Sequence, residues 1–150
     1  MRVALQRVSR AKVSVDEVCI GSINNGLLVL AGFEKEDTAD DLTWMASKIL
    51  GLRIFSDSEG KMNNDIIEAG GNILIISQFT LFASYKKGNR PSFIHAAPPG
   101  ESLKMYTDFC AAVSSRLGKK VETGQFGANM SIELVNDGPV TINMDSKTKM

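Results

Sequence analysis

The sequence predicts a single α/β domain, residues 1–150, in which two main helices pack on mixed β-sheets. The length of 150 residues is close to that of one domain. Strand-like alternation occurs near both ends of the chain, and two segments between them carry apolar residues at helical spacing. No linker, repeat or low-complexity segment separates these elements, so we expect one shared core.

The first third of the chain is predicted to form strands. Apolar and polar residues alternate from Ala11 to Asp16, which is the pattern of a half-buried strand. Asn24-Asn25-Gly26 indicates a turn, because Asn and Gly adopt positive φ at little cost. The run from Leu27 to Phe33 is apolar on both faces and therefore predicts a central strand.

A helix is predicted after Thr38, because Asp41 three residues later completes a pattern that resembles a capping box. Apolar positions between 42 and 50 fall on one helical face, and Gly51 is the expected stop. The polar stretch from Ser56 to Asn64 is predicted to be a loop. An apolar run at residues 73–76 then predicts a second buried strand.

A second helix is predicted from Glu101 to Leu117, with Gly118 as its C-terminal cap. Its expected apolar stripe consists of Leu103, Tyr106, Cys110, Val113 and Leu117. Alternating segments at residues 130–134 and 140–144 predict two closing strands. The polar residues 146–150 are expected to form a frayed tail.

Composition excludes several classes of protein. Seventeen basic residues balance seventeen acidic ones, and 43% of residues are hydrophobic, so the chain is neither disordered nor a strongly basic nucleic-acid binder. A local basic patch remains possible. The longest apolar stretch is far shorter than the roughly 20 residues that a membrane span needs. No export signal is visible, and the two cysteines lie far apart, so we expect a reduced, cytoplasmic location.

Ser77-Gln78-Phe79-Thr80-Leu81 departs from the pattern of a buried strand. The preceding strand should end in a turn, yet polar side chains continue and alternate with a phenylalanine. Polar groups at the end of a buried strand need hydrogen-bond partners. Either Ser77 and Thr80 cap a turn, or a ligand supplies the partner. The segment is therefore the first candidate site.

Asn136-Asp137-Gly138-Pro139-Val140 is the second candidate site. An Asp-Gly step between alternating runs is typical of a tight hairpin. Pro139, however, cannot donate a hydrogen bond to strand pairing. A Gly-Pro bond also has a real chance of being cis, which places two carbonyls side by side. The pattern thus leaves open both an ordinary turn and a specialised site.

A third feature is the basic, aromatic loop from Tyr85 to Arg90, which Pro91-Ser92-Phe93 follows. Such a cluster is usually a solvated face, but it would also suit a phosphate backbone that approaches residues 77–80. Other chemistries have little support. One histidine, His95, and two scattered cysteines cannot supply a usual zinc set. A Ser-His-Asp triad could use only His95, and a lone loop histidine is usually a surface residue.

Together these segments resemble one family, the D-aminoacyl-tRNA deacylases. The resemblance covers nearly the whole chain, and its most specific motifs are residues 77–81 and 136–141. A sister family that acts on L-alanyl mischarged tRNA carries different residues in both motifs, and this chain matches the D-specific version. Further matching segments are Leu5–Ala11, Gly26–Leu30, Arg53–Asp57, Gly60–Asn63, Arg90–Phe93 and Thr123–Met130.

The resemblance implies a three-layer β/β/α fold and a homodimer with its active sites at the subunit interface. The implied substrate is tRNA that carries a D-amino acid, or glycine, on its terminal adenosine, including glycyl-tRNA mischarged on tRNA-Ala. The implied reaction is hydrolysis of that ester as chiral proofreading in translation, with no metal, cofactor or membrane. The implied catalytic residues are Ser77, Gln78, Phe79 and Thr80. The implied pocket residues are Met130 and Ala112, and the implied residues for chirality are Arg7, Asn136, Gly138 and Pro139.

Two mechanisms are compatible with these residue types. An aminoacyl ester beside a vicinal hydroxyl is already reactive, so positioning matters more than a strong base. Backbone N–H groups near Phe79 and Thr80 are candidates for binding the oxyanion. Thr80 is either the nucleophile, which would need a base, or a residue that orients the ribose while the substrate 2′-hydroxyl activates water. The motif contains no histidine, cysteine or lysine, which favours the second mechanism.

In the family, chiral choice would depend on the Gly138-Pro139 segment of the partner subunit, whose carbonyls exclude an L side chain. Arg7 would hold that segment. Two other functions remain open at this stage. One is a non-catalytic module that sequesters mischarged tRNA, and the other is a generic serine or threonine esterase. Release of free amino acid under turnover conditions separates an enzyme from the binding module.

Overall fold

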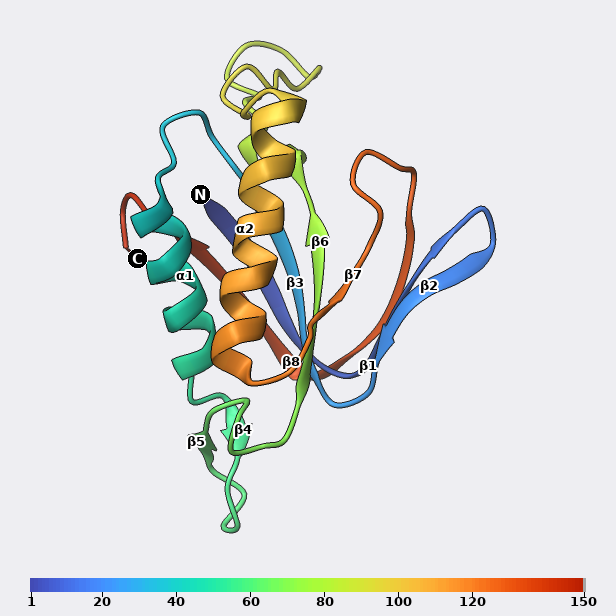
Figure 1. Cartoon of the computed structure of the whole chain (residues 1–150), viewed down its shortest axis with the longest axis vertical. Helices are drawn as coiled ribbons and strands as arrows, with labels where there is room; N and C mark the ends of the chain where they lie inside the picture. Colours follow the sequence, from blue (N-terminus) through green and yellow to red (C-terminus); the bar gives the residue numbers. More distant parts are fainter. Residues whose placement is uncertain (150) are drawn as a thin grey trace.

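The computed structural model describes residues 1–149 and has two helices on one side of a curved sheet (Figure 1). The first and last strands of the chain are the longest, and each helix connects two strands. In chain order the elements are β1 (Arg2–Val15), β2 (Val18–Ile23), β3 (Gly26–Gly32), α1 (Ala39–Gly51), β4 (Phe55–Ser56), β5 (Met62–Asn64), β6 (Asn72–Ser77), a 3₁₀ turn η1 (Phe79–Phe82), α2 (Pro99–Leu117), β7 (Glu122–Thr123) and β8 (Ser131–Asp145).

β1 is the organising strand of the main sheet. One edge of β1 pairs with β3 along its first half and with β2 along its second half, and its other edge pairs with β8. β6 and β7 extend the sheet beyond β3 with parallel pairing. The second half of β1, with β2 and the first half of β8, bends away from the helices, so the sheet forms two layers (Figure 1). With the helices these layers make the expected three-layer β/β/α arrangement.

Two hydrophobic clusters lie on opposite faces of the sheet. Alternate side chains of the central strands enter each cluster: Leu27, Val29 and Ala31 of β3 face the helices, whereas Leu28 faces the second β layer. The side chains of β6 alternate in the same way between the two clusters. This arrangement confirms the two predicted central strands, which are covered on both faces, except that β3 ends at Gly32 and Phe33 lies just beyond it.

α1 begins and α2 ends as the sequence predicts. The Asp41 carboxylate accepts hydrogen bonds of 2.9 Å from both the backbone N–H and the hydroxyl of Thr38 at the start of α1. α2 ends at Gly118, whose φ of 79° is a left-handed conformation that glycine adopts without steric cost. The expected stripe of α2 is wrong at one position, because Leu103 is 45% exposed and Phe109 is fully buried against Phe33 instead.

The segment from 130 to 144 differs from its prediction, since β8 is one continuous strand and not two strands joined by a turn. Gln6 pairs with Thr141 and Val8 pairs with Asn136, so the four residues 137–140 lie opposite the single residue Arg7. The chain bulges here and then resumes its pairing with β1, because the apolar residues on both sides of the bulge fit the same partner strand. The Gly138–Pro139 peptide bond is cis.

Two further predictions are corrected. The expected loop from Ser56 to Asn64 contains the short hairpin of β4 and β5. The tail is not frayed over residues 146–149: Ser146 is buried, its N–H donates to the Met1 carbonyl, and Lys147 binds Asp41. Met150, the last residue of the predicted tail, lies outside the described residues. No helix within residues 1–149 is long and apolar enough to cross a membrane.

Candidate active site

The candidate active site is a cavity of about 600 Å³ at the carboxyl end of β6. β6 and β7 are parallel, so their carboxyl ends open at the same edge of the sheet, where ligands of α/β proteins usually bind. The segments that follow these two strands therefore meet there, and the start of α2 closes the third side. The lining residues are Ile76, Ser77, Gln78, Phe79, Phe93, Ala96, Ala97, Pro98, Pro99, Ser102, Phe126, Gly127, Ala128, Asn129, Met130 and Ile132.

The end of β6 and the start of η1 present Ser77, Gln78 and Phe79 to this cavity, and Thr80 follows at its rim. The Gln78 N–H donates to the Ala31 carbonyl at 2.8 Å and ends the strand pairing, and Phe82 buries its side chain beneath the turn. Gly32 permits this close approach, because a Cβ there would lie 2.7 Å from the Gln78 carbonyl oxygen. Arg2 stabilises the turn from below by a 3.2 Å hydrogen bond to the Leu81 carbonyl.

The hydrogen bonds of this turn leave two backbone donors free. Leu81 N–H donates to the Gln78 carbonyl, and Ala83 N–H donates to the Thr80 carbonyl. The N–H groups of Phe79 and Thr80 have no acceptor within residues 1–149. Such unpaired donors at the first residues of a helical turn can bind a negatively charged oxygen.

The side chain of Thr80 has no base beside it. Its hydroxyl accepts a hydrogen bond from the Gln78 side-chain amide, and the residue is exposed at the rim and does not line the cavity. His95 is exposed and makes no hydrogen bond within the described part of the chain. Neither a Thr-His nor a Ser-His arrangement is therefore assembled within residues 1–149.

The cavity wall is aromatic and uncharged. Phe79 is 55% exposed and contacts Phe93 edge to face, with ring centroids 5.0 Å apart. Below them, Tyr106 donates a 2.8 Å hydrogen bond to the Ile75 carbonyl and stacks near Phe126. Burial raises the pKa of Tyr106 far above its ordinary value and that of Cys110 to about 11, so both groups stay protonated and neutral. They support the wall and do not supply acid–base chemistry at neutral pH.

Of the two predicted pocket residues, the structure places only one at this cavity. Met130 lines it from the segment that precedes β8. Ala112 does not: it lies ten residues beyond Ser102 on α2, roughly 15 Å along the helix axis, and packs against the main core. Sequence reasoning missed the contributions of Phe93 and residues 96–99, which lie in the irregular segment before α2 and at its first residue. The apolar composition that follows the basic loop was their one signal.

The second motif, residues 136–140, forms an exposed segment that hydrogen bonds hold in place. Residues 137–139 are exposed, while Arg7 beneath them is 8% exposed and donates to the carbonyls of both Asp137 and Ile54. The Asn136 side chain closes the bulge, because its oxygen accepts from Val140 N–H at 3.0 Å and its nitrogen donates to the Thr141 hydroxyl.

The two motifs do not meet within one chain. Asn136 pairs with Val8, which lies at the level of Gly26 and of Asn72 at the start of β6. Ser77 is at the other end of β6. Five strand residues separate the two levels, which corresponds to roughly 17 Å. The Gly138-Pro139 segment can therefore face a Ser77–Thr80 cavity only if that cavity belongs to another copy of the chain.

Comparisons with known proteins agree with this architecture. The family model described as D-Tyr-tRNA(Tyr) deacylase matches residues 4–145. The D-aminoacyl-tRNA deacylase of Phocaeicola vulgatus is 54% identical over 149 residues, which cover 99% of each chain. That of Dechloromonas aromatica is 54% identical over 147 residues and 98% of each chain.

Among solved structures, the c-Myc DNA Unwinding Element Binding Protein superposes with a TM-score of 0.90 and 38% identity, covering 97% of this chain and 98% of that one. Both the sequence match and the fold match extend over almost the whole chain. The chain therefore belongs to the D-Tyr-tRNA(Tyr) deacylase family.

Proposed function

We propose that the protein hydrolyses the ester bond between a D-amino acid and the terminal adenosine of tRNA, as chiral proofreading in translation. The observation that carries the proposal is the cavity lined by Ser77, Gln78 and Phe79, in which an uncharged aromatic wall lies next to the free backbone N–H groups of Phe79 and Thr80. The flat adenine base of the terminal adenosine suits the aromatic wall, and the N–H groups suit the oxyanion of a tetrahedral intermediate. Family membership gives the same reaction class.

In the proposed reaction, water adds to the ester carbonyl carbon, and the carbonyl oxygen becomes an oxyanion that accepts hydrogen bonds from Phe79 and Thr80 N–H. The bond between that carbon and the ribose 3′-oxygen then breaks, and the proton lost by water passes to the 3′-oxygen. The substrate 2′-hydroxyl activates the water, because Thr80 contacts an amide and no side-chain base lies beside it. Gln78 and Thr80 orient the ribose.

In this proposal, the partner subunit discriminates between D and L substrates. The distance between the two motifs along one chain requires a homodimer if Gly138-Pro139 is to reach the substrate. Arg7 and Asn136 hold that segment rigidly, so its backbone can fill the space that an L side chain would need. Glycine has no side chain to exclude, so glycyl-tRNA mischarged on tRNA-Ala is also a substrate. The place of action is the cytoplasm.

The test compares enantiomers. Purified protein is incubated with D-tyrosyl-tRNA and L-tyrosyl-tRNA, and free tyrosine is measured at several enzyme concentrations below that of substrate. We expect multiple turnovers on the D form and almost none on the L form. Equal rates would overturn the chiral assignment. Retention of intact D-tyrosyl-tRNA in a tight complex would instead identify a module that only sequesters it.

A further inference from the structure

The loop from Tyr85 to Pro91 concentrates positive charge on a chain with no net charge. Lys86, Lys87 and Arg90 are all exposed, and none of them forms a salt bridge or a hydrogen bond within residues 1–149. No aspartate or glutamate occurs between residues 77 and 100. Unpaired cations without acidic neighbours along the chain are the electrostatic footprint of a polyanion site.

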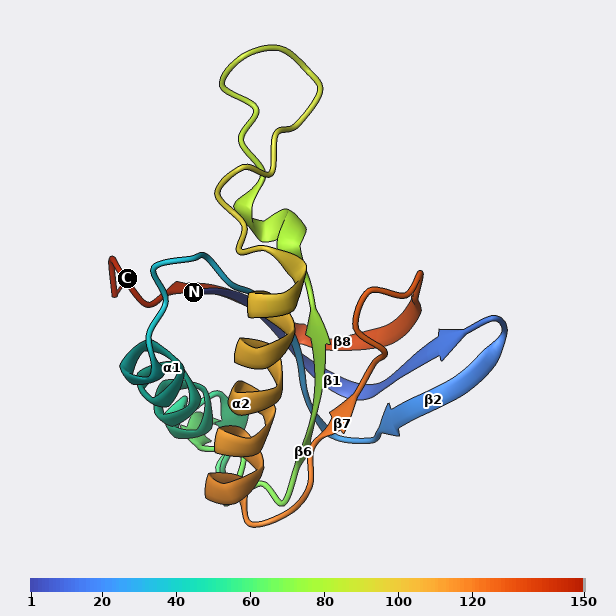
Figure 2. The same cartoon turned by 45° about the horizontal axis from the view of Figure 1, so that its top comes forward.

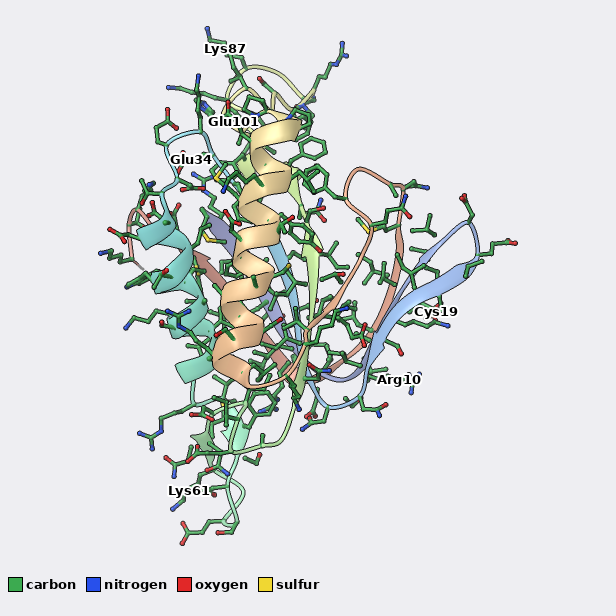
Figure 3. The ribbon with its side chains drawn as sticks, in the orientation of Figure 1. Arg10, Cys19, Glu34, Lys61, Lys87 and Glu101 are labelled. Carbon is green, nitrogen blue, oxygen red and sulfur yellow. The ribbon has the colours of Figure 1, made fainter. Side chains whose placement is uncertain are left out.

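The loop stands directly beside the candidate active site. Ser84 and Ser92 close its base with two reciprocal hydrogen bonds of 2.8 Å, and Phe93, the next residue, contacts Phe79 in the cavity wall. From this base the loop projects away from the body of the molecule (Figure 2). Lys87 lies at its outer part (Figure 3). A polymer whose end occupies the cavity would pass along this loop.

The loop is also built to present side chains and not to pack. Gly88, with φ of 77°, turns the chain at the tip, and a Cβ there would meet no atom within 4 Å. Tyr85 is 77% exposed and offers an aromatic face near the cations. Cations that follow a phosphate backbone, together with an exposed aromatic side chain, are the usual combination in proteins that bind single-stranded nucleic acid.

We propose that Lys86, Lys87 and Arg90 bind the backbone phosphates of the single-stranded 3′ end of tRNA, next to the terminal adenosine in the cavity. The proposal rests on the proposed function and adds the surface that recognises tRNA as a polyanion. The cavity itself has no charged lining residue, so the loop supplies the attraction to phosphate that the cavity lacks. The contact is independent of base identity and depends on salt.

The experiment separates this loop from the chemistry of the cavity. The variant K86A/K87A/R90A is compared with wild type on D-tyrosyl-tRNA and on 3′-O-(D-tyrosyl)adenosine, which lacks the phosphates. We expect kcat/KM for the tRNA substrate to fall by about tenfold or more near physiological salt, with activity on the small ester unchanged. Because three phosphate contacts are lost, the slope of log(kcat/KM) against log[salt] should become shallower by about 2.

The matched control K61A/K119A/K120A also removes three exposed cations, but from the far end of the molecule, where Figure 3 shows Lys61. It should leave both substrates and the salt slope unchanged, and K86R/K87R should retain wild-type behaviour. Equal salt slopes for wild type and K86A/K87A/R90A would overturn the proposal. If wild type hydrolyses neither substrate, the proposed function fails. The role of the loop is then tested by measuring how the affinity for tRNA without an amino acid depends on salt, in wild type and in K86A/K87A/R90A.

Discussion

The Thr80 hydroxyl is the side-chain oxygen that a nucleophilic mechanism would use, and its neighbour is the Gln78 amide. An amide cannot remove a proton as a base can, so we expect Thr80→Ala to keep activity on D-tyrosyl-tRNA within about tenfold of wild type, whereas loss of a true nucleophile costs about 10⁶-fold. Single-turnover hydrolysis measures this. A substrate that ends in 2′-deoxyadenosine should react poorly with both proteins. An inactive Thr80→Ala together with rapid deoxy hydrolysis would establish Thr80 as the nucleophile.

Arg7 is the second residue with a defined structural task, because one buried guanidinium serves the carbonyls of both Asp137 and Ile54. Hydrogen bonds from charged donors contribute about 1.5–3 kcal/mol, so Arg7→Ala should lower the free energy of unfolding by about that much in urea titrations. The preference for D over L substrate should fall as well. Lys12→Ala is the control on the same strand, since its ion pair with Glu133 is exposed and worth less than about 1 kcal/mol.

At the scale of elements, the connection from β7 to β8 shapes the cavity through Gly124. A Cβ at this position would lie 2.5 Å from the Met130 sulfur and 3.1 Å from Ile76 Cδ1. Gly124→Ala should therefore push the flexible Met130 side chain into the cavity, raise KM several-fold and leave kcat nearly unchanged. Steady-state kinetics with D-tyrosyl-tRNA test this. Gly100→Ala, where a Cβ meets no atom within 4 Å, should leave KM unchanged.

The first turn of α1 and the segment after β8 are joined by a charge pair with a predictable pH dependence. Burial alone would raise the pKa of Asp41, but hydrogen bonds from Lys147 and from Thr38 outweigh it and hold this pKa well below its usual range. The ionised carboxylate therefore stabilises the fold above pH of about 4, and this stability is lost as the pH falls further.

Asp41→Asn should accordingly lower the free energy of unfolding at pH 7, and its difference from wild type should shrink as the pH falls below about 4. Urea titrations across this range measure the difference. Asp40→Asn, an exposed neighbour in the same turn, should show a much smaller effect at every pH. A difference that grows on acidification would contradict the role of the Asp41 carboxylate.

At the scale of the whole molecule, the separation of the two motifs predicts a symmetric dimer with shared sites. Light scattering should give twice the monomer mass of 16.3 kDa. A sharper measurement refolds equal amounts of two variants together, one inactive through a change at Phe79 and one that has lost its D preference through a change at Asn136. In a hybrid dimer with shared sites, the one active site keeps an unaltered Asn136 from the partner, so activity on L-tyrosyl-tRNA should be about a quarter of that of the same amount of the Asn136 variant alone. A value of about one half, with hybrids demonstrated by mass, would show that each chain forms its site alone.

Local patterns in the sequence determined the elements that depend on neighbouring residues. The Thr38–Asp41 cap, the Gly118 stop and the two-sided apolar runs of β3 and β6 all follow from short-range periodicity and capping chemistry. The family resemblance, and not periodicity, pointed to residues 77–80, of which Ser77, Gln78 and Phe79 line the cavity. For the cap, the stop and the two apolar runs, the physical cause lies within a few residues of the feature.

Tertiary structure decided the features whose cause lies far along the chain. An Asp-Gly-Pro sequence favours a turn locally, yet pairing with β1 on both sides and the Arg7 guanidinium opposite keep β8 continuous. The tail is fixed because Ser146 bonds to Met1 and Lys147 to Asp41, both more than 100 residues away in sequence. Phe93 and Met130 come together only because β6 and β7 run parallel. The free energy that favours one local conformation is small compared with that of burial and strand pairing. These long-range contacts, which sequence periodicity does not predict, therefore set the final geometry.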